Sequence, residues 1–398
     1  MKLRATVIIV LTMLICISAA LSTNACGSKE PEPSPSPTPT FPPPPPPSTP
    51  EPTQTPVTLV PYDGIVEHIF FHEVIAWPEL AFGGTQRSAY DIEMVTVFEY
   101  NKILKELHEN GYILVDLNDV WSEYLSDSGH RRMRRNEMML PEGKRPLVIS
   151  YDDLSFYNYM RGQGFMERYV IGADGDVWAE GTDPAGNYVI SQDLAVITLL
   201  DKFIKENPDF SHNGAKGCIA LTGYEGILGY RTQNNKDDTS EAFRLNRMQE
   251  IARVGPVVQR LLDTGWYFAS HSFGHIRFER ASLATVEADA ERWLDEVGSL
   301  VGPTQIIIYA FGSRLDGDDS GSPGPAFRHY IDLGFRLFAS VGSRYYTEIK
   351  ADAAAVRMDR MLIGGQTLRH QPSIISRFFD PRDVFDPVRP EEFGNSWG

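Results

Sequence analysis

The sequence has few cysteines and a shortage of basic residues for its length. Of 398 residues only 3 are cysteine, and beyond residue 57 only Cys218 remains. One thiol cannot form a disulfide within a folded chain, so no covalent cross-link holds this part together. Acidic residues outnumber basic ones, and the formal net charge is −16. Because nucleic-acid binding needs a basic face, the composition argues against a nucleic-acid partner.

The first 25 residues have the pattern of a secretory signal peptide. Lys2 and Arg4 precede an apolar run, which ends in small residues before Cys26. The stretch NACGS resembles a lipoprotein signal with Cys26 as the lipid-anchored residue, although Thr23 stands where such signals usually carry leucine. Ordinary cleavage after Ala25 and an uncleaved anchor are the alternatives. All three predict an extracytoplasmic protein, and the first predicts attachment to a membrane.

Residues 26–57 form a proline-rich segment that contains half of the chain's 28 prolines. Such a composition favours extended polyproline II and cannot pack a hydrophobic core. At about 3.1 Å per residue the segment would reach on the order of 90 Å. We therefore expect a spacer between a membrane anchor and one folded domain at residues 58–398.

Apolar runs alternate with amphipathic stretches through residues 58–398. Seven runs are predicted strands: residues 66–72, 145–151, 217–223, 266–271, 305–311, 334–341 and 359–365. Four stretches are predicted helices: residues 97–112, 194–207, 245–265 and 285–302. This alternation predicts an α/β fold with a parallel sheet, and seven strands favour an irregular (β/α) barrel. Turn signals within residues 169–192 predict a β-hairpin insertion over the barrel face.

Several predicted strands end in polar residues. RPLVISY runs into Asp152 and Asp153, WYFAS runs into His271, and the first strand ends at His72. In a (β/α) barrel these ends meet at the face that carries the active site. Adjacent carboxylates repel each other and are costly to desolvate, which a bound cation would resolve. The alternative is that one of the aspartates caps a following helix.

Two pairs of histidines have a spacing of four residues. His68 and His72 lie in the strand-like EHIFFHEV, where a rise of about 3.3 Å per residue separates them by roughly 13 Å. His271 and His275 lie in SHSFGH, which follows a strand and contains Gly274. A turn or helical start there would bring their side chains to roughly 5–6 Å. The second pair is therefore a candidate metal site, with ordinary loop histidines as the alternative.

In combination these stretches resemble the polysaccharide deacetylase family, also described as the NodB-homology domain or carbohydrate esterase family four. The resemblance covers about residues 67–365, where SYDDLSFY and SHSFGH are similar to the family's aspartate and histidine motifs. IYAFGSR looks like a Tyr-x-Phe-Gly variant of the third motif, with Tyr309, Phe311 and Gly312 as expected substrate contacts. This segment lacks the motif's usual arginine, and Arg314 is the nearest one in sequence.

The resemblance implies a metal-dependent hydrolase that removes acetyl groups. By position in the motifs, Asp153, His271 and His275 would bind a divalent metal and Asp152 would be the general base. Two imidazoles and one carboxylate leave coordination positions open, as in catalytic zinc sites. Zinc is the expected ion, with cobalt, nickel and manganese as alternatives.

Two histidines are candidates for the general acid that protonates the departing amine. His72 lies at the end of the first predicted strand, whereas His370 follows the last one, in the chain order the family uses. We prefer His72, because the residues between His370 and the last strand could carry His370 away from the barrel mouth.

The expected substrate is an acetylated polysaccharide, either peptidoglycan or an exopolysaccharide such as poly-N-acetylglucosamine. The Tyr-x-Phe-Gly variant favours the exopolysaccharide by analogy. A non-catalytic glycan-binding lipoprotein on the same barrel is the alternative, motivated by the missing arginine and by the undecided identity of the acid. A glycoside hydrolase is disfavoured. Its two carboxyl groups stand about 5–9.5 Å apart on either side of the glycosidic bond, and the side chains of adjacent aspartates do not naturally flank a substrate in that way.

Overall fold

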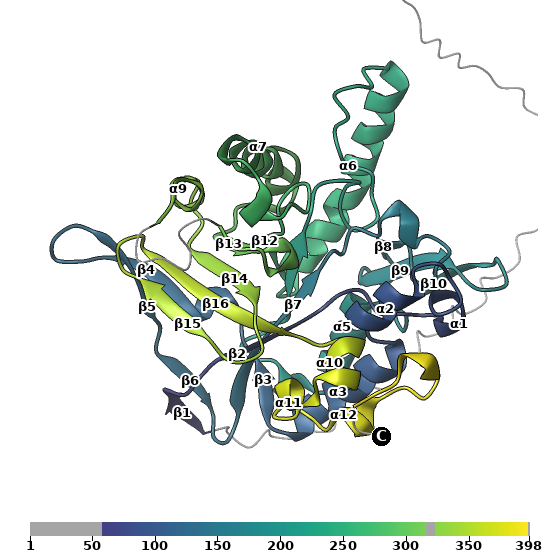
Figure 1. Ribbon diagram of the computed structural model, residues 1–398, viewed down its shortest axis with the longest axis horizontal. Helices are drawn as coiled ribbons and strands as arrows, with labels where there is room; N and C mark the ends of the chain where they lie inside the picture. Colours follow the sequence, from purple (N-terminus) through teal and green to yellow (C-terminus); the bar gives the residue numbers. More distant parts are fainter. Residues whose placement is uncertain (1–57, 316–322, 397–398) are drawn as a thin grey trace, which may run out of the picture. The chain divides into compact units, whose positions relative to one another are not determined.

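Seven parallel strands close into a barrel in the computed structural model of the protein (Figure 1). The order around the barrel is β2-β7-β11-β12-β13-β14-β16, and β16 pairs with β2 to close the ring. Each strand falls on one of the seven predicted runs, so the predicted seven-stranded irregular (β/α) barrel is confirmed. The strands are β2 (Glu67–Phe71), β7 (Arg145–Asp152), β11 (Cys218–Leu221), β12 (Tyr267–Ser270), β13 (Ile306–Ile308), β14 (Leu337–Val341) and β16 (Ala355–Leu362).

The structure describes residues 58–315 and 323–396. The expected signal peptide, the lipid-anchor residue Cys26 and the linker up to residue 57 lie outside this part, so they stay predictions. Within the described ranges, no helix combines the length and the apolar character that a membrane span requires.

Side chains alternate between the two faces of each barrel strand. Ile307 of β13 packs with helix residues in the layer between the strands and the surrounding helices. Its neighbours Ile306 and Ile308 belong to a second cluster, composed largely of strand residues, which fills the barrel interior. By the same alternation, Asp152 of β7 and Arg360 of β16 belong to the interior rows, because Val148 and Met358 lie in that cluster. This places charged groups inside the barrel near its carboxyl end.

Helices surround the barrel where the amphipathic stretches predict them. The four predicted helices correspond to α3 (Val97–Glu109), α5 (Val196–Glu206), α6 (Glu241–Asp263) and α7 (Leu283–Trp293). A π-helical segment, Leu294–Gly298, follows α7 directly and leads into the short helix α8 (Ser299–Val301). The remaining helices are α1 (Pro78–Ala81), α2 (Arg87–Glu93), α4 (Leu117–Val120), α9 (Pro325–Asp332), α10 (Gly365–His370), α11 (Pro372–Ile375) and α12 (Pro381–Val384).

The predicted hairpin insertion is a three-stranded antiparallel meander. It consists of β8 (Arg168–Ile171), β9 (Val177–Thr182) and β10 (Tyr188–Ser191). Both predicted turns are present, with Gly175 at φ 82° and Gly186 at φ 84°. Because two turns connect three strands, the insertion has one strand more than the predicted hairpin. The meander packs against α5 and α6 beside the barrel, rather than over its face.

Short strands complete the fold outside the barrel ring. β3 (Tyr112–Leu114) runs parallel to the first half of β7, and β15 (Thr347–Lys350) pairs antiparallel with β16. Two antiparallel pairs join β1 (Leu59–Tyr62) to β6 (Met138–Pro141) and β4 (Trp121–Leu125) to β5 (Arg131–Arg135).

Candidate active site

A cavity of about 630 Å³ lies at the carboxyl ends of the barrel strands, with α2 as one wall. It collects residues that end or follow β2, β7, β12 and β13, and eight of the predicted site residues line it. These are His72, Asp152, Asp153, His271, His275, Tyr309, Phe311 and Gly312.

Three of these residues form a group that could hold a metal ion. One ligand atom each of Asp153, His271 and His275 lies within 4.8 Å of the other two. His275 Nε2 lies 3.5 Å from Asp153 Oδ2. Zinc bonds of about 2.0–2.2 Å place two ligand atoms no more than about 4 Å apart. The separations in this group are therefore close to those that one divalent ion would require.

The surroundings of the three residues leave the right atoms available for a metal. His271 Nδ1 donates to the carbonyl oxygen of Ile308 at 2.8 Å, which makes Nε2 the atom with the lone pair. Tyr157 OH donates to Asp153 Oδ1 at 2.6 Å and leaves Oδ2 facing His275. Burial lowers the pKa of His275 to about 4, although Asp153 opposes the shift, so its imidazole is neutral at neutral pH. This donor set fits a divalent ion.

The backbone at the site is strained. Four non-glycine residues here adopt left-handed conformations: Asp153 (φ 62°), Ser272 (φ 58°), His275 (φ 51°) and Phe311 (φ 58°). Such conformations cost on the order of 1–3 kcal/mol each and persist where the surrounding structure enforces them, often at functional sites. The strain turns the side chains of Asp153 and His275 into the cavity.

The SHSFGH segment is a turn after β12 and contains no helical start. Asp289 of α7 holds this turn, because its carboxylate accepts hydrogen bonds from the backbone N–H groups of Phe273 (2.7 Å) and Gly274 (2.8 Å). Ser272 Oγ accepts a further bond from Ile276 N at 3.0 Å. These contacts, rather than a helix, set the spacing of the two histidines, whose ring centroids are 5.0 Å apart.

An arginine that the sequence analysis did not select clamps Asp152. Arg360 Nη1 and Nη2 donate to Asp152 Oδ1 and Oδ2 at 2.8 and 3.0 Å, in a bidentate pair. Burial alone would raise the pKa of Asp152, but the charge and hydrogen bonds of Arg360, with His271, lower it to about 2. Arg314, the nearest arginine in sequence, instead pairs with Asp359 at 2.7 Å.

The clamp continues into the barrel interior. Arg360 Nη1 also donates to Ser150 Oγ at 3.0 Å, and Ser150 Oγ lies 3.0 Å from His68 Nε2. Burial and the nearby Arg360 charge lower the pKa of His68 well below its usual range, so it is neutral. His68 thus lies below the cavity, whereas His72 lines it. The two histidines of this strand have separate surroundings, as their strand spacing predicts.

The two candidate acids lie in different places. His72 lines the cavity, and its Nδ1 donates to the carbonyl oxygen of Glu93 at the end of α2 over 3.1 Å. His370 is the last residue of α10, is exposed, and is absent from the described residues that line the cavity. Only His72 therefore has a short path to a ligand in the cavity.

The Tyr-x-Phe-Gly segment forms the wall next to His275. Phe311 is 52% exposed, and its ring lies 4.2 Å from the His275 ring and 3.8 Å from the Arg277 guanidinium carbon. Gly312 has φ 65°, and a Cβ there would approach Val341 Cβ to 3.0 Å, so a larger residue would be strained and would displace Val341. Tyr309 is buried beneath this wall.

A buried ion-pair network fixes the opposite wall. Arg389, near the C-terminus, donates to Glu99 at 2.6 Å and to Asp91 at 2.8 Å, and Arg369 pairs with Asp91 at 3.1 Å. Asp91 belongs to α2, and α10 and α12 lie against α2 and α3 (Figure 1). The C-terminal segment therefore holds the helix that carries Glu93, the partner of His72.

Comparisons with known proteins find structural likeness only. No family model matches the chain, and no curated protein matches it. Among solved structures, the Streptococcus pyogenes deacetylase PplD in complex with acetate has a TM-score of 0.42 and 13% identity, over 84% of this chain and 100% of that one. A polysaccharide deacetylase from Bacillus cereus (TM-score 0.39, 11% identity, 75% and 65% covered) and IcaB from Ammonifex degensii (0.38, 12%, 79% and 96%) are also similar. Likeness at this level assigns no activity, so the function is argued from the site itself.

Proposed function

We propose that the protein is a metal-dependent deacetylase that hydrolyses acetamide groups of an N-acetylated glycan. The observation that carries the proposal is the arrangement in one cavity of the Asp153, His271 and His275 group beside Asp152, which Arg360 keeps ionised. Neither part alone requires hydrolysis. Together they provide a site for a cation and a fixed proton acceptor within the same small volume.

Asp153, His271 and His275 would hold the ion, with zinc as the expected metal. When bound, such an ion supplies Lewis-acid chemistry: it polarises a carbonyl group and lowers the pKa of water. The protein contributes the orientation of the ligands, through Ile308 for His271 and Tyr157 for Asp153.

Asp152 would accept the proton from the attacking water. Its Oδ2 lies 3.9 Å from His271 Nε2, so the carboxylate borders the metal ligands. With a pKa of about 2 it is ionised across the neutral range. The two bonds from Arg360 leave further lone pairs on both carboxylate oxygens and fix their direction.

His72 would donate the proton to the departing amine. Because its Nδ1 already donates to Glu93, the atom that faces a substrate would be Nε2. A histidine suits this task because its ordinary pKa lies near the working pH. The exposed position of His370 gives it no comparable path to the cavity.

Exposed aromatic rings at the cavity mouth favour a sugar substrate. Phe311 and Tyr159 line the cavity and are about half exposed, at 52% and 51%. Flat aromatic faces pack against apolar surfaces such as the C–H face of a pyranose ring. The Tyr-x-Phe-Gly variant that carries Phe311 supports an exopolysaccharide such as poly-N-acetylglucosamine over peptidoglycan.

The proposed location rests on the sequence alone. A signal peptide, lipidation at Cys26 and a proline-rich spacer would hold the domain outside the cytoplasm at a membrane surface. A glycan of the cell envelope would then be within its reach.

A non-catalytic glycan-binding lipoprotein is the second candidate. Its motives were the missing arginine of the third motif and the undecided acid, and the clamp by Arg360 removes the first of these. Binding a sugar also does not require a carboxylate held ionised inside a barrel.

Acetate release from poly-N-acetylglucosamine oligomers, peptidoglycan fragments and O-acetylated glycans, measured together with metal content, tests the proposal. We expect one divalent ion per chain and release from at least one N-acetylated glycan. Asp152→Asn should retain the ion and lose acetate release, because it removes the proton acceptor and leaves the three ligands in place. Binding without acetate release from every substrate would favour the second candidate, and full activity of Asp152→Asn would exclude Asp152 as the base.

A further inference from the structure

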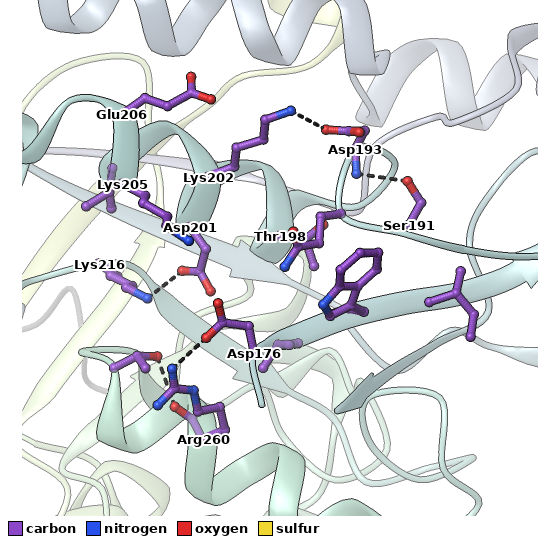
Figure 2. Close-up of a pocket in the computed structure, with 16 residues that line it drawn as sticks. Asp176, Ser191, Asp193, Thr198, Asp201, Lys202, Lys205, Glu206, Lys216 and Arg260 are labelled. Carbon is purple, nitrogen blue, oxygen red and sulfur yellow. Dashed lines mark hydrogen bonds and ion pairs between the residues drawn. The ribbon is translucent and has the colours of Figure 1, made fainter. Parts of the chain in front are cut away.

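A second cavity, of about 890 Å³, lies between the meander and α5, away from the candidate active site (Figure 2). We call it the meander cavity; β9, β10, α5 and the end of α6 contribute its lining. Lys216 precedes β11 and Thr264 precedes β12, so this part of the cavity lies at the amino ends of the barrel strands. Among the residues that the structure describes, the two cavities share no lining residue.

Three ion pairs lie along the wall of the meander cavity. Figure 2 shows them: Lys216–Asp201 (2.6 Å), Arg260–Asp176 (2.5 Å) and Lys202–Asp193 (2.7 Å). Lys205 and Glu206 add one charge of each sign. The cavity is therefore charge-balanced in a chain whose net charge is −16.

This balance restricts the ligand. A polyanion needs a surplus of cationic groups, and a metal ion needs a surplus of carboxylates, and the lining offers neither. Carboxylates accept hydrogen bonds from hydroxyl groups, while ammonium and guanidinium groups donate to hydroxyl and carbonyl oxygens. Closely spaced donors and acceptors of this kind suit a neutral ligand that is rich in hydroxyl and amide groups.

The cavity also has an apolar surface for a ring. Trp178 of β9 is half-buried in its lining, and its Nε1 donates to Asp174 Oδ1 at 3.0 Å, which fixes the indole. Ile190 of β10 lies in the same lining. A fixed indole face beside alternating polar groups matches a pyranose, which has a C–H face and a rim of hydroxyl groups.

We propose that the meander cavity binds a neutral N-acetylated glycan chain at a second site, separate from the one where acetyl groups are removed. The choice of glycan rests on the proposed function, whereas the neutral, hydroxyl-rich class rests on the cavity itself. A second site would hold a long polymer while the active site acts on another part of it.

Calorimetric titration of the full chain carrying Asp152→Asn with an N-acetylglucosamine hexamer tests the inference. The Asn variant avoids turnover during the measurement. We expect two binding events, of which Trp178→Ala removes one or weakens it by about tenfold or more. Tyr188→Ala is the matched control: Tyr188 is 65% exposed on β10 of the same meander and does not line the cavity.

Independent variants guard against a folding defect in Trp178→Ala. Asp176 and Lys202 are 37% and 49% exposed, so the double change Asp176→Ala/Lys202→Ala removes lining groups with little loss of packing. It should weaken the same binding event. Unchanged binding in this variant and in folded Trp178→Ala would overturn the inference, and tighter binding of a galacturonate hexamer would overturn the neutral-ligand assignment.

This test is separable from that of the proposed function. If the barrel site is not a deacetylase site, acetate release fails but the binding event sensitive to Trp178 remains. If the meander cavity binds no glycan, acetate release from short oligomers persists and only the second binding event is absent.

Discussion

Replacing Arg360 with methionine should destabilise the metal-free protein by about 3–5 kcal/mol at pH 7, because it leaves the charge of Asp152 buried without its partner. The Arg360 side chain is 0% exposed and makes both hydrogen bonds to that carboxylate. The pKa of Asp152 falls from its ordinary 3.8 to about 2. At about 1.4 kcal/mol for each pKa unit, this fall alone corresponds to about 2–3 kcal/mol. The lost bond to Ser150 Oγ adds to the cost.

The size of the effect should depend on pH in a defined direction. In the parent protein the pKa of Asp152 is below its unfolded value, so the stability from this pair is present above about pH 4 and declines as the pH falls towards 2. In Arg360→Met burial acts without the guanidinium and raises the pKa of Asp152. Its protonated form then removes the buried charge, and the difference from the parent narrows in acid. Urea unfolding of chelator-treated protein at pH 7, 5 and 4 measures this difference.

Two further variants make this test specific. Arg314→Met removes an arginine whose side chain is 27% exposed and pairs with Asp359, and it should cost about 1 kcal/mol or less. Arg360→Met/Asp152→Asn removes both charges and should recover most of the lost stability. A loss below about 1 kcal/mol in Arg360→Met, or a double variant no more stable than the single one, would refute the reasoning.

Three other predictions concern the metal, the acid and a buried carboxyl group. Elemental analysis of His271→Ala should show most of the divalent metal gone; retention of the metal would mean a different ligand set. His72→Ala should lose at least about 100-fold in turnover at unchanged metal content, whereas His370→Ala should stay near the parent; normal turnover in both would mean that neither is the acid. Burial raises the pKa of Glu73 to about 7, so the parent should lose stability as the pH rises from about 5 to 8. Glu73→Gln should flatten that dependence in urea unfolding, and an equal slope would contradict the assignment.

The barrel strands could be predicted because most of their residues are buried on both faces. β2, β11 and β12 are buried at every position, and such strands appear in sequence as continuous apolar runs. Some strands outside the ring carry no such signal. RRMRR of β5 has one buried residue among five, and LVPY of β1 has none. β1 pairs with β6, which is distant in sequence, so the pattern of β1 alone did not identify it.

The meander shows the limit of turn signals. The two turns were visible in the sequence because glycine is needed where φ is positive, as at Gly175 and Gly186. Three strands follow from two turns, but where the sheet packs does not. The groups of the meander cavity come from several separate stretches, and Asp176 meets Arg260 across 84 positions of the chain. No local pattern contains that contact.

The site divides in the same way. Asp152, Asp153, His271 and His275 lie in two short motifs at strand ends, so sequence alone could place them at one mouth. Arg360 reaches Asp152 across the barrel interior from a strand 208 positions later. Attention to the third motif pointed to Arg314, which is close in sequence to the expected place but pairs elsewhere. A signal was present nonetheless: Arg360 directly precedes the apolar residues 361–363 of a predicted strand, and an arginine buried there needs a carboxylate as partner. Asp152, at the end of another strand, was the carboxylate available to it. The two residues are therefore identified as a pair by their opposite charges at buried positions, and not by their distance along the chain.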